Sequence, residues 1–457
     1  MQHILLKKFN VFSFITITFF CTSCANIIPP SGGPRDSLPP VLMESLPKDS
    51  TINFNSKKIT LTFDEFVEVK EVLQNVIINP TLTNQPNIDY KLKNVFITFK
   101  DSLKPNTTYS INFGNSIKDV NEGNITKNKT YVFSTGKKID KNIIKGTVIV
   151  AKDGSVDSTL IAVLHNNLND TAIYKLLPQY TSKLNGQGEF IFHNLPDTTF
   201  NLFIIPNGFI KKYTDSTKLF GFENKPIKAQ TESDNNVIYV FKEKEEEPKK
   251  PSIKSSEKIK FSLQTNIVNG RFDVLDSSLI IISNKAIKKI DSSSISILDS
   301  NYKSISPLTF NYDSVDMKIK IDFVKNFSTK YYLIVNKTLL IDSISKSAQI
   351  IDTTAFVTFR EVDYGKLKLR CNKTISNEVL VIYKDDLLIK SLPITKEMVI
   401  DVFKPGEYTL RVLYDENKNG FWDTGNYKSK KQPEKFITLK TKLLVRAKWD
   451  NELEISW

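Results

Sequence analysis

Apolar and polar residues alternate along most of this 457-residue chain. In "KKITLTFDEFVEV", for example, Ile59, Leu61 and Phe63 alternate with lysine and threonine. A period of two indicates a β-strand with one buried face, and turn signals such as "KPNT" and "DVNEGN" separate successive strands. No long stretch has helical periodicity, and Phe, Tyr, Ile, Thr and Ser are abundant. The pattern predicts an all-β chain of tandem β-sandwiches.

The first group of strands spans residues 39–137. It contains "PPVLMESLPKDSTINFNSKKITLTFDEFVEV", "LKPNTTYSINFGNSIKDVNEGN" and "YVFSTG". These stretches resemble the SbsA-type bacterial Ig-like domain that occurs at the N-terminus of envelope lipoproteins of the Bacteroidetes. The resemblance implies a β-sandwich and an exported protein, but no reaction.

The second group of strands spans residues 143–241 and begins with "IIKGTVIVAKDGS". A glycine-rich turn, "GEFIF" and the turn "NLPDTT" follow in that order. This order is similar to the transthyretin-like, carboxypeptidase-regulatory type of β-sandwich, which the resemblance implies here. Residues 242–260 begin with "KEKEEEPKK" and offer nothing apolar to bury, so they predict an exposed charged linker.

The half of the chain after the linker repeats the half before it. Residues 277–300 can be laid on 57–80, and 317–336 on 95–113, with strands and turns in the same order. Residues 261–360 are therefore predicted to form a diverged Ig-like β-sandwich. "FKPGEYTLRVLYDENKNG" matches the place of "NLPDTTFNLFIIPNG", which predicts a second transthyretin-like β-sandwich over 364–457.

The N-terminus predicts a secretory signal peptide over residues 1–23. Lys7 and Lys8 precede an apolar stretch of about a dozen residues, which is too short to span a bilayer. "CTSCAN" resembles the bacterial lipoprotein cleavage box, which implies that Cys24 becomes the acylated first residue, followed by a tether over 24–38. The alternative, a redox-active Cys21–Cys24 pair, lacks the thioredoxin-like context of that motif.

The charge and the cysteines narrow the environment further. Removing Lys7 and Lys8 from the formal charge of +13 leaves a mature chain of +11. In a cell envelope such a surface favours an anionic glycan, lipid headgroup or acidic protein as partner, and not nucleic acid. Cys371 is the one cysteine outside the processed segment, so the exported sandwiches depend on core packing and not on internal disulfides.

Catalytic residues are scarce. His165 and His193 are the histidines of the mature chain, too few for a three-histidine zinc site, and no serine-hydrolase or phosphate-binding motif occurs. The acidic pairs Asp64–Glu65 and Asp119–Glu122 lie at predicted strand ends, where the Ig-like resemblance makes them framework residues. The chain is therefore predicted not to be an enzyme.

The segment "YDENKNGFWDTG", residues 414–425, is the strongest candidate for a site. Asp415, Asn417, Asn419 and Asp423 fit positions 1, 3, 5 and 9 of a calcium loop, but Asn426 stands at position 12, where a bidentate Glu is required. A strand precedes the loop where an EF-hand has a helix. The alternatives are a calcium site of low affinity and an Asn-Gly hairpin turn without metal.

Three functions remain open on the sequence alone. The first is a non-enzymatic, lipid-anchored scaffold that binds envelope proteins. The second is a glycan-binding accessory lipoprotein in which Phe421 or Trp422 stacks on sugars, and the third is an enzyme built on Asp64 and Glu65. The acidic export tag that the Bacteroidetes resemblance implies for surface-displayed members is missing from "ANIIPPS". We therefore expect the outer membrane, and its periplasmic leaflet before the cell surface.

Overall fold

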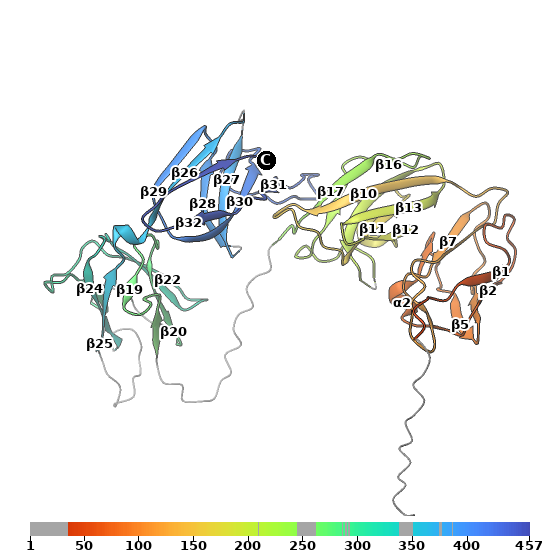
Figure 1. Ribbon diagram of the computed structural model, residues 1–457, viewed down its shortest axis with the longest axis horizontal. Helices are drawn as coiled ribbons and strands as arrows, with labels where there is room; N and C mark the ends of the chain where they lie inside the picture. The colour runs from red at the N-terminus through yellow and green to blue at the C-terminus, as the bar shows by residue number, and fades with distance from the viewer. Residues whose placement is uncertain are drawn as a thin grey trace, which may run out of the picture. The chain divides into compact units, whose positions relative to one another are not determined.

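A computed structural model describes residues 35–457 except 209, 245–261, 286, 288–289, 291–292, 338–350, 374–376 and 386. The predicted signal peptide, Cys24 and most of the predicted tether and linker lie outside the described residues. The all-β prediction is confirmed, because strands dominate (Figure 1) and the described helices are the short α2 (Val72–Asn75), α3 (Ala172–Lys175) and η1 (Glu361–Asp363). No described helix is long and apolar enough to cross a membrane.

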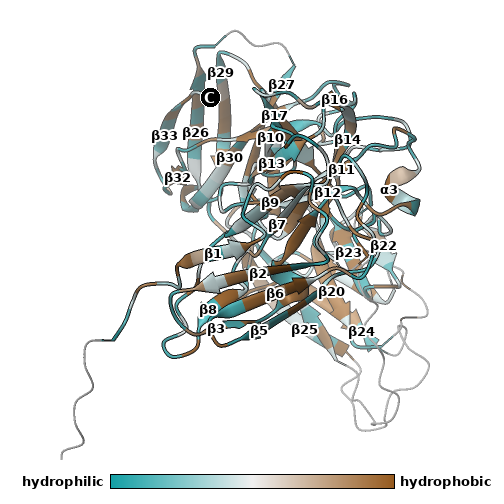
Figure 2. Cartoon of the chain, turned by 90° about the vertical axis from the view of Figure 1, so that its right-hand side faces the viewer, coloured by the Kyte–Doolittle hydropathy of each residue, from teal (hydrophilic) through white to brown (hydrophobic). Residues whose placement is uncertain are grey.

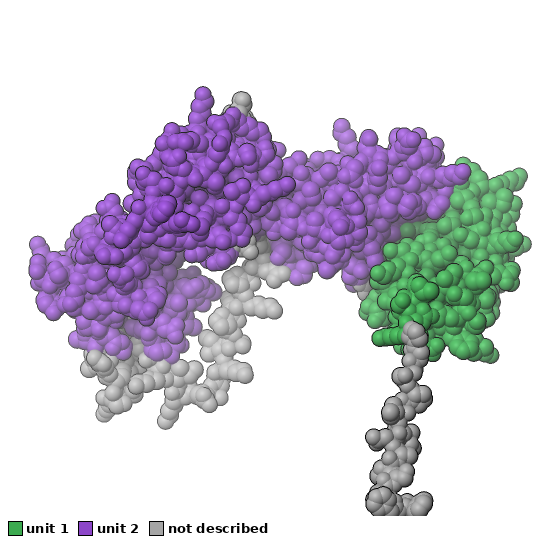
Figure 3. Space-filling view, in the orientation of Figure 1, with its two compact units in different colours: residues 1–139 green, residues 140–457 purple. Residues whose placement is uncertain are grey.

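The chain divides into two compact units, residues 1–139 and 140–457, which Figure 3 colours separately. The strands form β-sandwiches, each with its own cluster of buried apolar residues. Figure 2 shows that apolar residues, in brown, gather on the strands. We name the sandwiches first to fourth in chain order, the first lying in unit 1 and the others in unit 2.

The first sandwich packs the sheet β1-β2-β6-β5 against the sheet β4-β7-β9, with β3-β8 as an additional pair. Phe133 lies at its centre, with its ring centroid 4.1 Å from that of Phe54 and 5.3 Å from that of Tyr109. Its strands are β1 (Leu42–Leu46), β2 (Lys58–Phe63), β3 (Val67–Val69), β4 (Ile77–Asn79), β5 (Asn87–Lys91), β6 (Asn94–Thr98), β7 (Thr108–Asn112), β8 (Ile117–Asp119) and β9 (Thr130–Ser134).

The second sandwich packs the sheet β13-β10-β17 against the sheet β12-β11-β14-β15, with β16 paired to β14. Strand β10 is antiparallel to β13 and parallel to β17. Its strands are β10 (Asn142–Val150), β11 (Leu160–His165), β12 (Tyr180–Lys183), β13 (Glu189–Leu195), β14 (Thr199–Pro206), β15 (Gly221–Phe222), β16 (Ile227–Lys228) and β17 (Asn235–Val240).

The third sandwich packs the sheet β18-β20-β23-β22 against the sheet β19-β25-β24-β21. Its core includes Phe272, Tyr331 and Phe356. Its strands are β18 (Leu263–Thr265), β19 (Arg271–Phe272), β20 (Leu279–Ser283), β21 (Ile295–Leu298), β22 (Thr309–Asp313), β23 (Lys318–Asp322), β24 (Lys330–Asn336) and β25 (Ile351–Thr358).

The fourth sandwich packs the sheet β29-β26-β33 against the sheet β28-β27-β30-β31, with β32 paired to β30. Strand β26 is antiparallel to β29 and parallel to β33. Its strands are β26 (Gly365–Cys371), β27 (Glu378–Lys384), β28 (Leu387–Pro393), β29 (Glu397–Phe403), β30 (Gly406–Tyr414), β31 (Lys435–Thr438), β32 (Leu443–Val445) and β33 (Asp450–Ile455).

Strand order recurs between the first and third sandwiches and between the second and fourth. Strands β20, β21, β23 and β24 pair as β2, β4, β6 and β7 do, in the places that the sequence alignment gives them. A hydrogen bond from a backbone amide to the hydroxyl of a tyrosine five residues later, which we call the polar corner, recurs as well. The Tyr109 hydroxyl accepts a hydrogen bond from the Lys104 amide (2.9 Å), and the Tyr331 hydroxyl accepts one from the Asn326 amide (3.2 Å).

Strand β11 in the second sandwich is buried on both faces. Ala162 and Leu164 face the interior of the sandwich, whereas Ile161 and Val163 belong to a second apolar cluster on the opposite face of the same sheet. His165 ends this strand with none of its surface exposed, and neither ring nitrogen has a hydrogen-bond partner in the described part of the chain. Its ring lies edge-on to Phe203 at 5.8 Å. The imidazole is therefore held neutral, because nothing there compensates a buried charge.

We expect the free energy of unfolding to fall as the pH drops below about 6.5. Burial lowers the pKa of folded His165 to about 4, so protonation favours the unfolded chain. The loss is absent above the unfolded pKa and grows by about 1.4 kcal/mol per pH unit as the pH falls toward the folded value. Urea unfolding at pH 7 and at pH 5 should show about 2 kcal/mol of pH dependence that His165→Leu removes.

The matched control is His193, which lies exposed on β13. His193→Leu should leave that pH dependence in place. Retention of the full pH dependence in His165→Leu would show that carboxylates, and not this imidazole, cause it.

Candidate functional site

The loop at residues 415–434, between β30 and β31, begins as a closed hydrogen-bonded turn. Asp415 is 2 % exposed, and its carboxylate accepts hydrogen bonds from the amides of Asn419 (3.1 Å) and Gly420 (2.7 Å). Gly420 has a φ of 78°, the left-handed conformation that Asn-Gly turns use. Asn417 donates a side-chain hydrogen bond to Asp423. The oxygens that the sequence offers to calcium thus hold the backbone of the loop itself.

Glu434 is the residue of this loop that sequence spacing missed. It is 4 % exposed, and its carboxylate accepts hydrogen bonds from the amides of Glu416 (3.0 Å) and Asp423 (2.9 Å). Burial raises its pKa, and the nearby charges of Asp415 and Asp423 act in the same direction. Glu434, which lies beyond the calcium-like motif, therefore bonds the backbone near both ends of that motif. Even so, the described residues contain no group of three or more His, Cys, Asp or Glu arranged to hold a metal.

Phe421 and Trp422, the predicted sugar-stacking residues, differ in their surroundings. Phe421 is 65 % exposed and lines a cleft of about 520 Å³. The cleft also has a polar side with Asn377, Lys418 and Asn419 and an apolar floor with Val379 and Ile394.

Trp422 is half-buried and acts in packing. Its ring lies parallel to that of Phe436 (18°, centroids 6.5 Å apart), and its indole N–H donates to the Glu434 carbonyl at 2.8 Å. It packs against the outer apolar clusters of both the second and the fourth sandwich. Of the two aromatic residues, Phe421 is therefore the one with a ring available to a ligand.

The later part of the loop inserts into the second sandwich. Tyr427 is 2 % exposed, and its ring centroid lies 4.9 Å from Phe222, 5.4 Å from Phe220 and 5.5 Å from Phe203. Tyr213 stacks on Phe220 at 3.9 Å and extends the same aromatic socket. The socket covers the outer face of β11 and β14, so Tyr427 completes a core that the second sandwich does not close by itself.

Polar groups around Tyr427 are satisfied across the same junction. Its amide and the Tyr213 hydroxyl each donate to one oxygen of the Glu243 carboxylate, both at 2.7 Å. The Lys430 ammonium lies 3.9 Å from the centre of the Tyr427 ring and binds Asp170 at 2.5 Å. Burial, reinforced by Asp170, raises the pKa of the Tyr427 hydroxyl well above its usual range. Paired charges and hydrogen bonds make the junction specific as well as apolar.

A second junction joins the third and fourth sandwiches through Asp273. This carboxylate is 5 % exposed, binds the Lys404 ammonium at 2.7 Å and accepts a hydrogen bond from the Tyr364 hydroxyl. Burial opposes its ionisation, but the bonds from Lys404 and Tyr364 outweigh burial and hold the pKa of Asp273 below its usual value. The fourth sandwich therefore contacts both of its neighbours in unit 2.

The remaining candidates lie apart from this loop. Asp119, 1 % exposed, accepts hydrogen bonds from the amides of Glu122, Gly123 and Asn124, which is a turn framework. Burial, followed by the charge of Asp119, raises the pKa of Glu65. Cys371 is buried in the core of the fourth sandwich.

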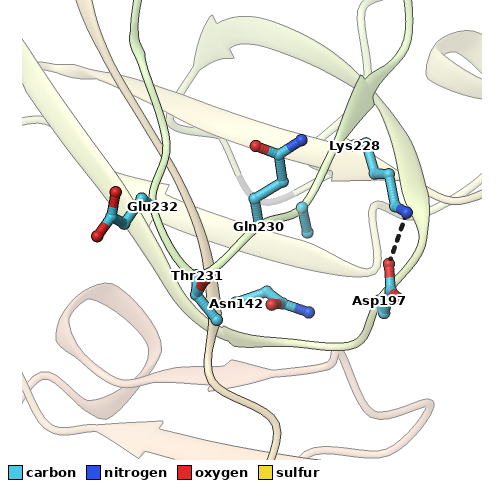
Figure 4. A pocket seen from close by; sticks show the side chains of 7 residues that line it. Asn142, Asp197, Lys228, Gln230, Thr231 and Glu232 are labelled. Carbon is cyan, nitrogen blue, oxygen red and sulfur yellow. Dashed lines mark ion pairs between the residues drawn. The ribbon is translucent and has the colours of Figure 1, made fainter.

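A second cavity lies at one end of the second sandwich. Its volume is about 370 Å³, and Lys228 and Asp197 form an ion pair there at 3.2 Å. Figure 4 shows how the side chains of its lining residues lie. Its other lining residues are Asn142, Ala229, Gln230, Thr231 and Glu232. It has no aromatic lining, so the loop at 415–434 remains the better candidate site.

Residues 36–135 match the family model of a bacterial Ig-like domain, which accounts for the first sandwich. No curated protein matches the chain. Among solved structures, it is similar to the Bacillus anthracis TIE protein, with 12 % identity, 93 % of this chain and 75 % of that chain covered, and a TM-score of 0.17. It is also similar to BcpA, the major pilin subunit of Bacillus cereus, with 10 % identity, 70 % of this chain and 99 % of that chain covered, and a TM-score of 0.17. The S-layer protein rSbsC has 10 % identity, with 91 % of this chain and 54 % of that chain covered, and a TM-score of 0.15. TM-scores this low carry no argument about function.

Asp415→Ala should lower the free energy of unfolding by about 1–3 kcal/mol, because the part-buried Gly420 amide loses its charged acceptor and the Asn419 amide keeps only the Asn417 side chain. If the loop is a turn, urea unfolding gives the same loss in EDTA and in millimolar calcium. A loss that is larger in calcium would instead assign a metal to the loop. Asp401→Ala removes a 78 % exposed carboxylate of the same sandwich and serves as the control, with a change within about 0.5 kcal/mol.

Tyr427→Ala should separate the second and fourth sandwiches. Truncating a buried aromatic side chain costs about 3–5 kcal/mol, and here the loss falls on the junction. Hydrogen exchange should accelerate in β11, β14 and β15 while the core of the first sandwich stays protected. Phe421→Ala, an exposed aromatic of the same loop, should leave exchange unchanged. Equal protection in Tyr427→Ala and the unaltered chain would show that this ring does not hold the second and fourth sandwiches together.

Proposed function

We propose that this chain is a non-enzymatic scaffold of the bacterial cell envelope, anchored through acylated Cys24. The observation that carries the proposal is the junction at Tyr427, where two sandwiches separated in sequence share one aromatic core. Such a junction fixes the spacing of modules, as a scaffold requires. The bacterial Ig-like domain at residues 36–135 supports the same reading.

We further propose a type for each module and a location for the chain. The second and fourth sandwiches are proposed to be transthyretin-like on their sequence motifs, and they share a strand that is antiparallel to one neighbour and parallel to the other. Origin in the Bacteroidetes and attachment to the periplasmic leaflet of the outer membrane rest on the N-terminal sequence. The Ig-like assignment of the third sandwich rests on the tyrosine hydroxyl that accepts a backbone amide at Tyr331, as at Tyr109 in the first sandwich.

Partners are proposed to be an envelope protein or an anionic glycan, attracted by the formal charge of +11 that remains after removal of Lys7 and Lys8 from +13. A glycan-binding accessory role is the second candidate function. The cleft at Phe421 favours it, because an exposed ring stands there beside amide and ammonium groups. Concave sites with few polar groups around an apolar floor are typical of small-ligand binding.

Cys24→Ala should abolish incorporation of a fatty-acid label and release the protein from membranes into the soluble fraction. Stable attachment needs two or more acyl chains, and Cys24 is the residue proposed to carry them. Cys371→Ala is the control and should keep both the label and the membrane association. Labelling that persists without Cys24 would exclude this residue as the anchor.

A further inference from the structure

Tyr302 in the third sandwich has a backbone in the left-handed region while its side chain lies at the surface. Its φ is 59°, in the left-handed region that glycine and asparagine occupy at low cost. The side chain is 67 % exposed, so burial does not compensate this strain. Strain of this kind persists where surrounding structure enforces it, and it is frequent at binding sites.

The turn that enforces this conformation is well defined. The Tyr302 amide donates to the Asp299 carbonyl at 3.0 Å, and the Asp299 carboxylate accepts from the amides of Asn301 and Lys303, both at 2.9 Å. Asp299 therefore uses its charge within the turn. The result is a fixed platform from which the Tyr302 ring projects.

The Tyr302 ring lies flat on Tyr332. Their centroids are 4.8 Å apart with an interplanar angle of 17°, and the hydroxyls are within hydrogen-bond distance at 3.3 Å. Tyr332 lies on β24, an inner strand of the sheet β19-β25-β24-β21, with Leu298 and Ala355 as its cross-strand neighbours. The two phenols thus form a stacked aromatic pair beside Leu298 and Ala355 on this sheet.

A cation completes this surface. The Lys330 ammonium lies 5.0 Å from the centre of the Tyr332 ring, on the same strand face. Hydrogen bonding to Tyr332 raises the pKa of Lys330, which keeps the ammonium charged. The stacked rings and hydroxyls of Tyr302 and Tyr332 therefore lie next to the positive charge of Lys330.

We propose that Tyr302, Tyr332 and Lys330 form a binding surface for an acidic polysaccharide, with a uronate ring stacked on Tyr302 and its carboxylate paired with Lys330. A pyranose ring presents an apolar C–H face that can cover an exposed aromatic ring. The phenol hydroxyls donate to and accept from sugar hydroxyls. The cation selects acidic over neutral sugars by charge complementarity. The inference rests on the anionic-glycan partner proposed above and gives it a location apart from the cleft at Phe421.

The test uses the mature chain in affinity gel electrophoresis with polygalacturonate, with neutral dextran or with no polymer. Polygalacturonate should slow the unaltered chain and dextran should not. Tyr302→Gly should weaken binding at least tenfold while the melting temperature stays the same or rises, since glycine relieves the strained φ. Lys330→Ala should weaken binding severalfold and reduce its salt dependence.

Two controls separate the site from general charge and general aromatic exposure. Lys320→Ala removes an exposed lysine from β23 on the other sheet of the same sandwich, and Tyr90→Ala removes a 46 % exposed tyrosine from the first sandwich. Both should bind polygalacturonate as the unaltered chain does. Equal weakening by either control, or full binding by Tyr302→Gly, would overturn this site while leaving the glycan partner standing. Failure of the unaltered chain to bind the acidic polymer would overturn the site and its uronate ligand together.

Discussion

The arrangement of unit 2 depends on one constraint, the apolar outer face of the sheet that contains β11 and β14. In a two-sheet sandwich the outer face is ordinarily solvated, with polar residues at alternate positions. Here Ile161 and Val163 point outward and Phe203 joins them from β14. Such a face requires a cover, because exposed apolar surface of this extent favours association. Tyr427 supplies that cover from the opposite end of unit 2.

Covering this face from a distant segment has a modest entropic cost. Loop-closure entropy grows only with the logarithm of loop length, and the third sandwich, which lies between the second and the fourth in sequence, is itself folded and held to the fourth. Lys404 then holds the third sandwich to the fourth through Asp273, whose buried carboxylate would lose its compensating charge without this lysine. The fourth sandwich therefore contacts both the second and the third sandwich. Its loop at 415–434 has a structural role in addition to containing the candidate site.

Much of the fold could be predicted from the sequence, because a period of two reports directly which face of a strand is buried. The tandem sandwiches and the repeat between the two halves follow from that pattern and from turn residues. The role of Tyr427 did not follow, since "GNYKSKKQPE" has the composition of an exposed loop. A signal was present in its partner: "LIAVLH" is apolar at consecutive positions, which indicates a strand covered on both sides. The role of Glu434 could not be predicted because the calcium-loop rule covers twelve consecutive residues, whereas Glu434 lies beyond them, directly before β31.

Aromatic residues on outer sheet faces have different consequences in the second and third sandwiches. In the second, Phe203, Phe220 and Phe222 pack around Tyr427, and Glu243 and Asp170 satisfy its polar atoms. In the third, Tyr302 and Tyr332 stack on each other, and the outer ring stays 67 % exposed near the Lys330 ammonium. A ring whose polar partners are all internal stabilises a fold. An exposed ring held by a strained turn gains no comparable burial, so stability alone does not account for its position.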